Sequence, residues 1–551
     1  MTGRAGERQT AGGRRQTTEV RSGAMAARRA GVLLVAVLMV PTHLWAQEAG
    51  PAKANGPWFG LRLPPRPGEA PAVRVGGRPP RPVARPADET ASPDLDAGRI
   101  RADLETIVGF ATDARRREEQ GSQQMWGRVA GFPSAAKTVE WAAAEFRRAG
   151  IGDVRVQPIV QDARASFWMP LSWEVRLLAD PAFGEGTADV VLHSALPLSP
   201  SNIPGGTLTA PLVYVGTATP AVSRLIDVKG KIAVELVVPQ GHMLFERGAV
   251  DARAEDLVKR GAVGVFNLVR LPGNEASRDF SDCGNPCFNI GGRDGHFLEQ
   301  VLDRAALAGA GDRVRVRIAL SSETRTGLKA ENAVAVIAGR RADEVIVLNA
   351  HVDGWFDGAG DNADGLAVLM ALARHFARPG NHPDRTLVFV ASAGHHTPGI
   401  NGPRSFVAAN PELAKAALML VNIEHVAQRN FSPARTTSPD GYREAVADSG
   451  EAPIAVGVTN ASPFLQALID QGPARYGVNF ISERSTFQSG ETGGWSALPV
   501  AKVSVMQAPP LYHTTGEVLD VISEPGLERI ARFLAQLVAQ ADQAQARTIN
   551  P

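Results

Sequence analysis

The sequence predicts an α/β fold in which a mostly parallel, mixed sheet is flanked by helices and a β-rich domain is inserted into the chain. From residue 323 onward, strand-like apolar runs alternate with helical patterns, as in sheets that helices cover on both faces. Between 206 and 322 the runs are mostly β-like, with one helical stretch at 252–262. The 551 residues, 44% of them hydrophobic, are enough for two or three domains with their own cores.

The N-terminal segment predicts export. Met25 opens a short basic stretch, which is followed by the apolar run GVLLVAVLMVPTHLWA and a small residue at Ala46. This pattern is typical of a secretory signal peptide at 25–46, and the run is too short to favour a membrane-spanning helix. Residues 1–24 are therefore expected to be an upstream extension that is not native. We expect a periplasmic or secreted protein without a membrane span in its mature chain.

Residues 47–94 are crowded with Pro, Gly, Arg and Ala, which predicts an extended linker that buries little. Ordered structure is expected to begin near Pro93. Helical spacing of apolar residues follows at 94–117 and at 134–150, where Gly150 ends the second helix.

The inserted domain at 206–322 contains the strand-like runs APLVYVG, GKIAVELVV, VGVFNLV and VRVRIAL. The pattern VKGKIAVELV, followed by a helix that ends in KRGAVGVFN, resembles the protease-associated (PA) domain found inserted in several exopeptidases. That resemblance implies a domain without chemistry of its own, between two parts of the main domain at 95–205 and 323–551.

The chain has two cysteines, Cys283 and Cys287, in the sequence DCGNPCF. Export to an oxidising compartment favours a local disulfide between them, although the spacing also suits a metal clip.

Polar residues able to bind metal follow four strand-like runs of the main domain. The runs lie at 345–350, 386–393, 417–423 and 501–508. The residues just beyond them, in chain order, are His351 and Asp353, His395 and His396, Glu424, and His513, with Asp361 in the glycine-rich loop GAGDNADG as a further candidate. Ligands bind at the carboxyl ends of strands in such sheets, and imidazole with carboxylate suits zinc or a similar divalent metal. A single His after a strand is more often an ordinary loop residue, so the coincidence of several positions carries the prediction.

The sequence NAHVDGWFDGAGDNADGLAVLMALARHF resembles the signature of the M28 family of zinc peptidases, in which a His-x-Asp motif precedes a Gly-rich Asp-Asn loop and a helix. ENAVAVIAG and LYHTTGEVLDVI are also similar to segments of that family. The resemblance implies a zinc exopeptidase fold with one or two zinc ions and peptide substrates, most simply those of an aminopeptidase.

When the family's metal ligands are carried over motif by motif, the resemblance implies that His351 binds one metal and that Asp361 bridges two. Glu424 and His513 would complete the ligands. Asp353 would orient the imidazole of His351 through a hydrogen bond. Asn362 and Gly365 would shape the loop.

The chain departs from the family in AGHHTPG, where members usually carry two adjacent glutamates, a general base and a metal ligand. With one gap, His395 takes the place of the base and His396 that of the ligand. Without a gap, His396 and Thr397 take those places. We prefer the gapped alignment because it leaves chemically competent residues at both positions. A neutral imidazole in place of a carboxylate should weaken binding of a second dication.

Other functions fit the sequence less well. A formal net charge of +1 and the absence of a basic stripe argue against nucleic-acid binding, and there is no Gly-x-Ser-x-Gly or His-Glu-x-x-His motif. Two alternative functions remain compatible with the sequence. The altered HH motif is compatible with a catalytically degenerate relative that binds peptides or a protein partner. The fold is compatible with an acyltransferase of the glutaminyl cyclase type. The histidines without a partner pattern are expected to be structural: His193, His242, His296, His375 and His425.

Overall fold

The computed structural model describes residues 56–66, 73–238, 243–278, 283, 285–434, 441–442, 445–458, 460, 462–483, 490–507 and 509–551. All of them belong to one compact unit that begins at Pro51. The predicted signal peptide and the extension before it lie outside the described residues.

The main domain is built on an eight-stranded mixed sheet of order β20-β19-β21-β16-β13-β15-β12-β3. The strands are β3 (Asp153–Val160), β12 (Lys329–Ile337), β13 (Arg341–His351), β15 (Arg385–Ser392), β16 (Ala417–Glu424), β19 (Ile454–Val458), β20 (Phe480–Glu483) and β21 (Ala501–Gln507). The four central strands β15, β13, β16 and β21 are parallel, whereas β12, β3 and β19 pair antiparallel. The predicted α/β fold with a mixed, mostly parallel sheet is confirmed.

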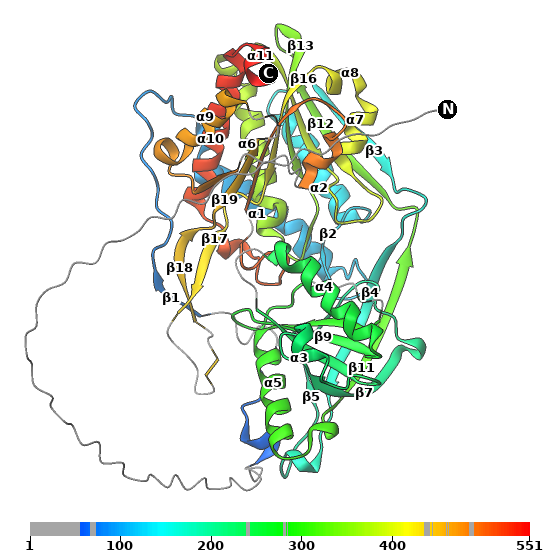
Figure 1. Cartoon of the computed structure of the whole chain (residues 1–551). Helices are drawn as coiled ribbons and strands as arrows, with labels where there is room; N and C mark the ends of the chain where they lie inside the picture. Colours follow the sequence, from blue (N-terminus) through cyan, green and yellow to red (C-terminus); the bar gives the residue numbers. More distant parts are fainter. Residues whose placement is uncertain are drawn as a thin grey trace, which may run out of the picture. The chain divides into compact units, whose positions relative to one another are not determined.

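Helices cover both faces of this sheet because residues of each central strand alternate between two cores. Ile346 and Leu348 of β13 pack in the larger core, and Val345 and Val347 pack in the smaller one. The larger core is formed with α1 (Ala97–Arg116), α2 (Pro133–Arg148), α6 (Asp364–Ala377), α9 (Pro463–Tyr476), α10 (Glu524–Gln543) and α11 (Ala546–Ile549), and the smaller with α7 (Gly402–Ala409) and α8 (Pro411–Lys415). Figure 1 shows α6, α9 and α10 on one side of β13 and β16, and α7 and α8 on the other.

A second eight-stranded sheet has the order β5-β4-β11-β7-β8-β9-β10-β6. Its strands are β4 (Phe167–Leu177), β5 (Val190–Val191), β6 (Leu196–Pro197), β7 (Thr207–Tyr214), β8 (Ile232–Val237), β9 (Gly264–Val269), β10 (Cys287–Ile290) and β11 (Arg315–Arg325), joined by α3 (Pro220–Ser223), α4 (Met243–Lys259) and α5 (Gly292–Leu307). β4 pairs with β11 over its whole length. β4, β5 and β6, which precede the boundary expected at 205, pair in this second sheet.

Two smaller sheets complete the fold. β1 (Val73–Gly77), β18 (Ala445–Glu451) and β17 (Arg429–Pro433) form one, and β2 (Gly127–Arg128) pairs with β14 (Gly354–Trp355) in the other.

The expectation that residues 47–94 bury little does not hold at Trp58. The side chain of Trp58 is 1% exposed and stacks against Phe183, and its indole N–H donates to the carbonyl of Ala188 at 3.0 Å. Strand β1 pairs parallel with β18. A single aromatic residue in a Pro-rich stretch has no periodicity, so its burial depends on the pocket that the second domain offers it.

Candidate metal centre

The carboxyl ends of the central strands bring the predicted residues to one edge of the main sheet. His351 is the last residue of β13, and Glu424 is the last residue of β16. His395 and His396 follow the end of β15, and His513 follows the end of β21. Because these strands are parallel neighbours, the residues after them meet at the same edge.

Asp361 lies at the middle of this group and is completely buried. Four imidazole Nε2 atoms face its carboxylate, two at each oxygen. Oδ1 lies 2.9 Å from His425 and 3.3 Å from His351. Oδ2 lies 2.7 Å from His513 and 3.2 Å from His396. A carboxylate with two imidazoles at each oxygen is a geometry able to bridge two cations.

The loop that carries Asp361 is held by a close approach of the backbone to Gln428. At Gly360, a Cβ atom would lie 1.7 Å from the Nε2 atom of Gln428. Arg128 is fully buried beside the same loop, and its guanidinium donates to the carbonyls of Val352 and Gly358, both at 3.0 Å. The glycine and the arginine thus fix the position of the Asp361 carboxylate.

Two sets of side chains are compact enough to hold an ion. The ligand atoms of His351, His395 and Glu424 lie within 4.8 Å of one another, and so do those of His351, Asp361 and His396. The Nε2 atom of His351 lies 3.8 Å from Oε1 of Glu424.

Asp353 supports two imidazoles, one more than the sequence predicted. Its Oδ1 lies 3.0 Å from Nδ1 of His351. Its Oδ2 lies 3.2 Å from Nδ1 of His396 and accepts a hydrogen bond from the His396 backbone N–H at 3.1 Å. This approach requires Gly394, where a Cβ atom would lie 1.6 Å from Oδ1 of Asp353. Both imidazoles therefore turn Nε2 toward the centre.

His396, and not Thr397, faces the cluster. The hydroxyl of Thr397 donates to the carbonyl of Ala130 at 2.7 Å, so it is used elsewhere. The ring of His396 lies 5.1 Å from that of His513, centroid to centroid. This arrangement supports the gapped alignment.

The carboxylates and imidazoles of the cluster shift one another's pKa values, and the carboxylates favour positive charge at the centre. Burial raises the pKa of Asp361, but the charges of the surrounding imidazoles, foremost His396, outweigh it and hold this pKa well below its usual value. Burial lowers the pKa of His396, but Asp361 and Asp353 raise it well above 6.5. Burial likewise opposes the charge of His425, and Asp361 raises the pKa of that imidazole to about 9. Because metal binding requires these imidazoles to be deprotonated, protons would compete with a metal ion at this centre.

Two buried imidazole nitrogens support the fit of these residues to a metal. Within the described part of the chain, the Nε2 atoms of His351 and His396 are buried and form no hydrogen bond of good geometry, and each faces an oxygen of Asp361 at 3.2–3.3 Å. Such atoms are costly to bury, and a divalent cation would satisfy them. Imidazole nitrogen with carboxylate oxygen is a donor set typical of zinc.

Sequence reasoning missed three residues of the cluster. His425, expected to be structural, contacts Asp361. Glu491 is 1% exposed, and its Oε1 lies 2.5 Å from Nδ1 of His395. Glu517 is fully buried and accepts hydrogen bonds from Gln428 and from the backbone N–H of His513. A glutamate among polar or glycine residues gives no signal in the sequence, and a histidine directly after another candidate ligand would point to the opposite face of a regular strand.

The second sheet reaches the centre through residues 275–278. The backbone N–H of Arg278 donates to the carbonyl of His513 at 2.9 Å, and the hydroxyl of Thr515 donates to Glu275 at 2.6 Å. The guanidinium of Arg278 lies over the ring of Trp355, 4.9 Å from its centroid. Residues 275–278, between β9 and β10, therefore support the segment that carries His513.

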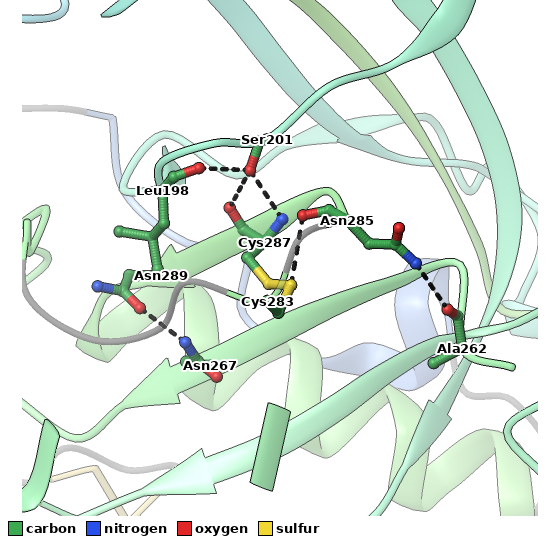
Figure 2. The surroundings of a disulfide bond; sticks show 8 residues. All are labelled: Leu198, Ser201, Ala262, Asn267, Cys283, Asn285, Cys287 and Asn289. Carbon is green, nitrogen blue, oxygen red and sulfur yellow. Dashed lines mark hydrogen bonds between the residues drawn. A yellow bond between two sulfur atoms is a disulfide. The ribbon is translucent and has the colours of Figure 1, made fainter. Parts of the chain in front are cut away.

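Cys283 and Cys287 form a disulfide at the start of β10, in the second sheet. Figure 2 shows the hydroxyl of Ser201 beside it, where it accepts from the backbone N–H of Cys287 at 2.9 Å. The amide of Asn285 donates to the carbonyl of Ala262 at 3.2 Å. Neither cysteine belongs to the described groups that could hold a metal.

None of the described helices is both long enough and apolar enough to cross a membrane.

Comparisons with known proteins agree with this site. Solved structures of similar fold include a peptidase M28 precursor from Shewanella amazonensis SB2B, with a TM-score of 0.57 and 20% identity over 82% of this chain and 96% of that one. A zinc aminopeptidase from Bacillus subtilis has a TM-score of 0.54 and 17% identity, over 82% of this chain and 97% of that one. An aminopeptidase from Aneurinibacillus sp. strain AM-1 has a TM-score of 0.50 and 20% identity, over 81% of this chain and 94% of that one. No curated protein sequence matches significantly.

The sequence profile of peptidase family M28 matches residues 332–538. That segment contains every residue of the cluster around Asp361. The chain therefore carries a metallopeptidase domain that is similar to peptidase family M28 over these residues.

Proposed function

We propose that this chain is an exported, zinc-dependent exopeptidase that removes residues from the free N-terminus of peptides. The observation that carries the proposal is the convergence of buried imidazoles on the two oxygens of Asp361. The fold that it shares with aminopeptidases supports the choice of reaction.

Five residues are proposed to hold the metal. Asp361 would be shared by two metal positions, with His351 and Glu424 near its Oδ1 and His396 and His513 near its Oδ2. One or two zinc ions would supply Lewis-acid activation of the scissile carbonyl and of water.

Asp353 and His395 are proposed to assist catalysis. Asp353 fixes the rings of His351 and His396, because its two oxygens lie 3.0 and 3.2 Å from their Nδ1 atoms. His395 accepts a proton from water at Nε2, since its Nδ1 is occupied by Glu491. Its side chain is 35% exposed, so a proton can leave to solvent.

The remaining parts of the chain are assigned in the same proposal. Residues 25–46 direct export and are removed, so that the mature protein begins near Gln47. The second sheet is a PA domain, which supports the main domain and has no chemistry of its own. N-terminal sequencing of exported protein tests the first assignment, and an intact N-terminus in the cytosol would contradict it.

The activity is tested with a panel of aminoacyl substrates and their N-acetylated counterparts, together with metal analysis of the purified protein. An aminopeptidase binds metal and cleaves only substrates with a free N-terminus, and chelation abolishes cleavage. Bound metal without turnover of any substrate would favour a peptide-binding relative. Formation of pyroglutamate from an N-terminal glutamine would favour the acyltransferase.

A further inference from the structure

His425 is a buried imidazole with both ring nitrogens in defined surroundings. It follows Glu424 directly, and its side chain is 1% exposed. Its Nδ1 lies 3.1 Å from the backbone carbonyl of Gln507, and its own carbonyl accepts from the Gln507 N–H at 2.8 Å. Because a carbonyl can only accept, Nδ1 carries the hydrogen and donates it.

The other nitrogen of His425 faces two carboxylates. Nε2 lies 2.9 Å from Oδ1 of Asp361 and 4.0 Å from Oε1 of Glu424. Ionised carboxylates also only accept hydrogen bonds. The lone pair of a neutral His425 would therefore face oxygen lone pairs, unless a cation lies between them.

The two ring nitrogens of His351 are placed in a similar way, with an acceptor at Nδ1 and the carboxylates of Asp361 and Glu424 near Nε2. Its Nδ1 is held by Asp353, and its Nε2 lies 3.3 Å from Oδ1 of Asp361 and 3.8 Å from Oε1 of Glu424. Imidazoles that bind metal almost always donate their second N–H to a carboxylate or a backbone carbonyl. His351 has the first kind of partner and His425 has the second.

We propose that His425 is a further metal ligand, which shares the ion on the Oδ1 side of Asp361 with His351 and Glu424. The inference rests on the proposed metal centre and adds a residue to it. Tetrahedral zinc with bonds of about 2.0–2.2 Å places neighbouring ligand atoms roughly 3.3–3.6 Å apart. The distances from Nε2 of His425 to the two carboxylates, 2.9 and 4.0 Å, lie on either side of that value.

The extra imidazole also sets which metal the centre prefers. With His396 in the place of a carboxylate ligand, and His425 added, nitrogen donors predominate over oxygen donors. Imidazole suits zinc, copper, iron and nickel, whereas carboxylate and carbonyl oxygen suit magnesium, calcium and manganese. We expect the protein to retain zinc in the presence of excess magnesium or manganese.

Anomalous diffraction at the zinc edge tests the proposal on wild-type crystals soaked in zinc. We expect a zinc ion within about 2.0–2.2 Å of Nε2 of His425. A zinc ion bound by His351 and Glu424 but more than 3 Å from His425 would overturn the proposal, and no bound zinc at all would instead overturn the proposed metal centre.

A variant adds a measurement in solution. His425→Gln should weaken zinc binding by more than the roughly 10–100-fold that loss of an outer-sphere partner costs. It should also change the visible absorption of the cobalt-substituted protein. The matched control is His375→Gln, because His375 lies on α6, where its Nδ1 contacts Ser92 and not the cluster. Wild-type zinc affinity and an unchanged cobalt spectrum in folded His425→Gln would refute the assignment.

Discussion

Nδ1 of His395 lies 2.5 Å from Oε1 of Glu491, and the carboxylate of Glu491 is almost completely buried. Glu491 thereby fixes which nitrogen of His395 faces the cluster. Burial lowers the pKa of His395, but the hydrogen bond and the charge of Glu491 outweigh burial and raise this pKa to about 8. In the proposed mechanism, this pair takes the role of the general base.

Glu491→Gln should lower kcat by about 10–100-fold and leave KM nearly unchanged, because His395 would lose its orientation and not its contact with substrate. In the metal-free protein, the pKa of His395 should also fall, since the neutral amide no longer stabilises the imidazolium. Steady-state kinetics and an NMR titration of His395 measure the two effects. Equal kcat in variant and wild type would show that Glu491 does not act through His395.

The two adjacent histidines should differ in what they contribute. His396→Ala should lower the zinc content, because the Nε2 atom of His396 faces Asp361. His395→Ala should retain zinc and reduce hydrolysis by roughly 10²–10⁴-fold, the usual contribution of a general base. Metal analysis and kinetics on each variant separate the roles. Loss of zinc from His395→Ala would make His395 a ligand, and wild-type turnover in the double variant would exclude both residues from the reaction.

Asp353→Asn should weaken zinc binding by about 10–100-fold, because one carboxylate orients both His351 and His396. Calorimetric zinc titration measures the change. Asp357→Asn is the matched control, since Asp357 lies on the same stretch of chain but accepts a hydrogen bond from Trp126 and does not contact the cluster. Equal zinc affinity in Asp353→Asn and in the control would contradict the role of Asp353.

Zinc affinity should keep rising with pH above the pKa of about 6.5 of an ordinary histidine. His396 has a pKa well above that value and His425 has one of about 9, so protons compete with zinc through this range. Zinc affinity rises with pH because both imidazoles must lose a proton to bind metal, and their pKa values are raised in the protein without metal. Competition with a chelator of known affinity between pH 6 and 9 measures the slope. A plateau from pH 7 upward would contradict these pKa directions.

The strand ends that carry His351 and Glu424 could be predicted because each follows a continuous apolar run, and parallel strands end at one edge. His425 could not be predicted in this way. Successive side chains of a strand point to opposite faces, so regular alternation would turn His425 away from Glu424. Its φ of +50° is left-handed, which breaks the alternation and lets both side chains face Asp361.

Other residues were missed because their positions depend on distant parts of the fold. Glu491 lies in the short 3-10 helix Gly490–Trp495. This helix has no periodic pattern of apolar residues, so the sequence does not indicate that Glu491 lies beside the end of β15. β4 joins the second sheet through its pairing with β11, more than a hundred residues later in the chain. The burial of Trp58 likewise needs Phe183 and Phe297, which belong to another domain.

The central claim is that Asp361 organises a metal centre on which peptide hydrolysis depends. The most direct measurement is the zinc content and aminopeptidase turnover of Asp361→Asn, beside Asp357→Asn as the control. We predict that Asp361→Asn loses bound zinc and turnover together, while the control keeps both. Full zinc content with wild-type turnover in Asp361→Asn would contradict the account.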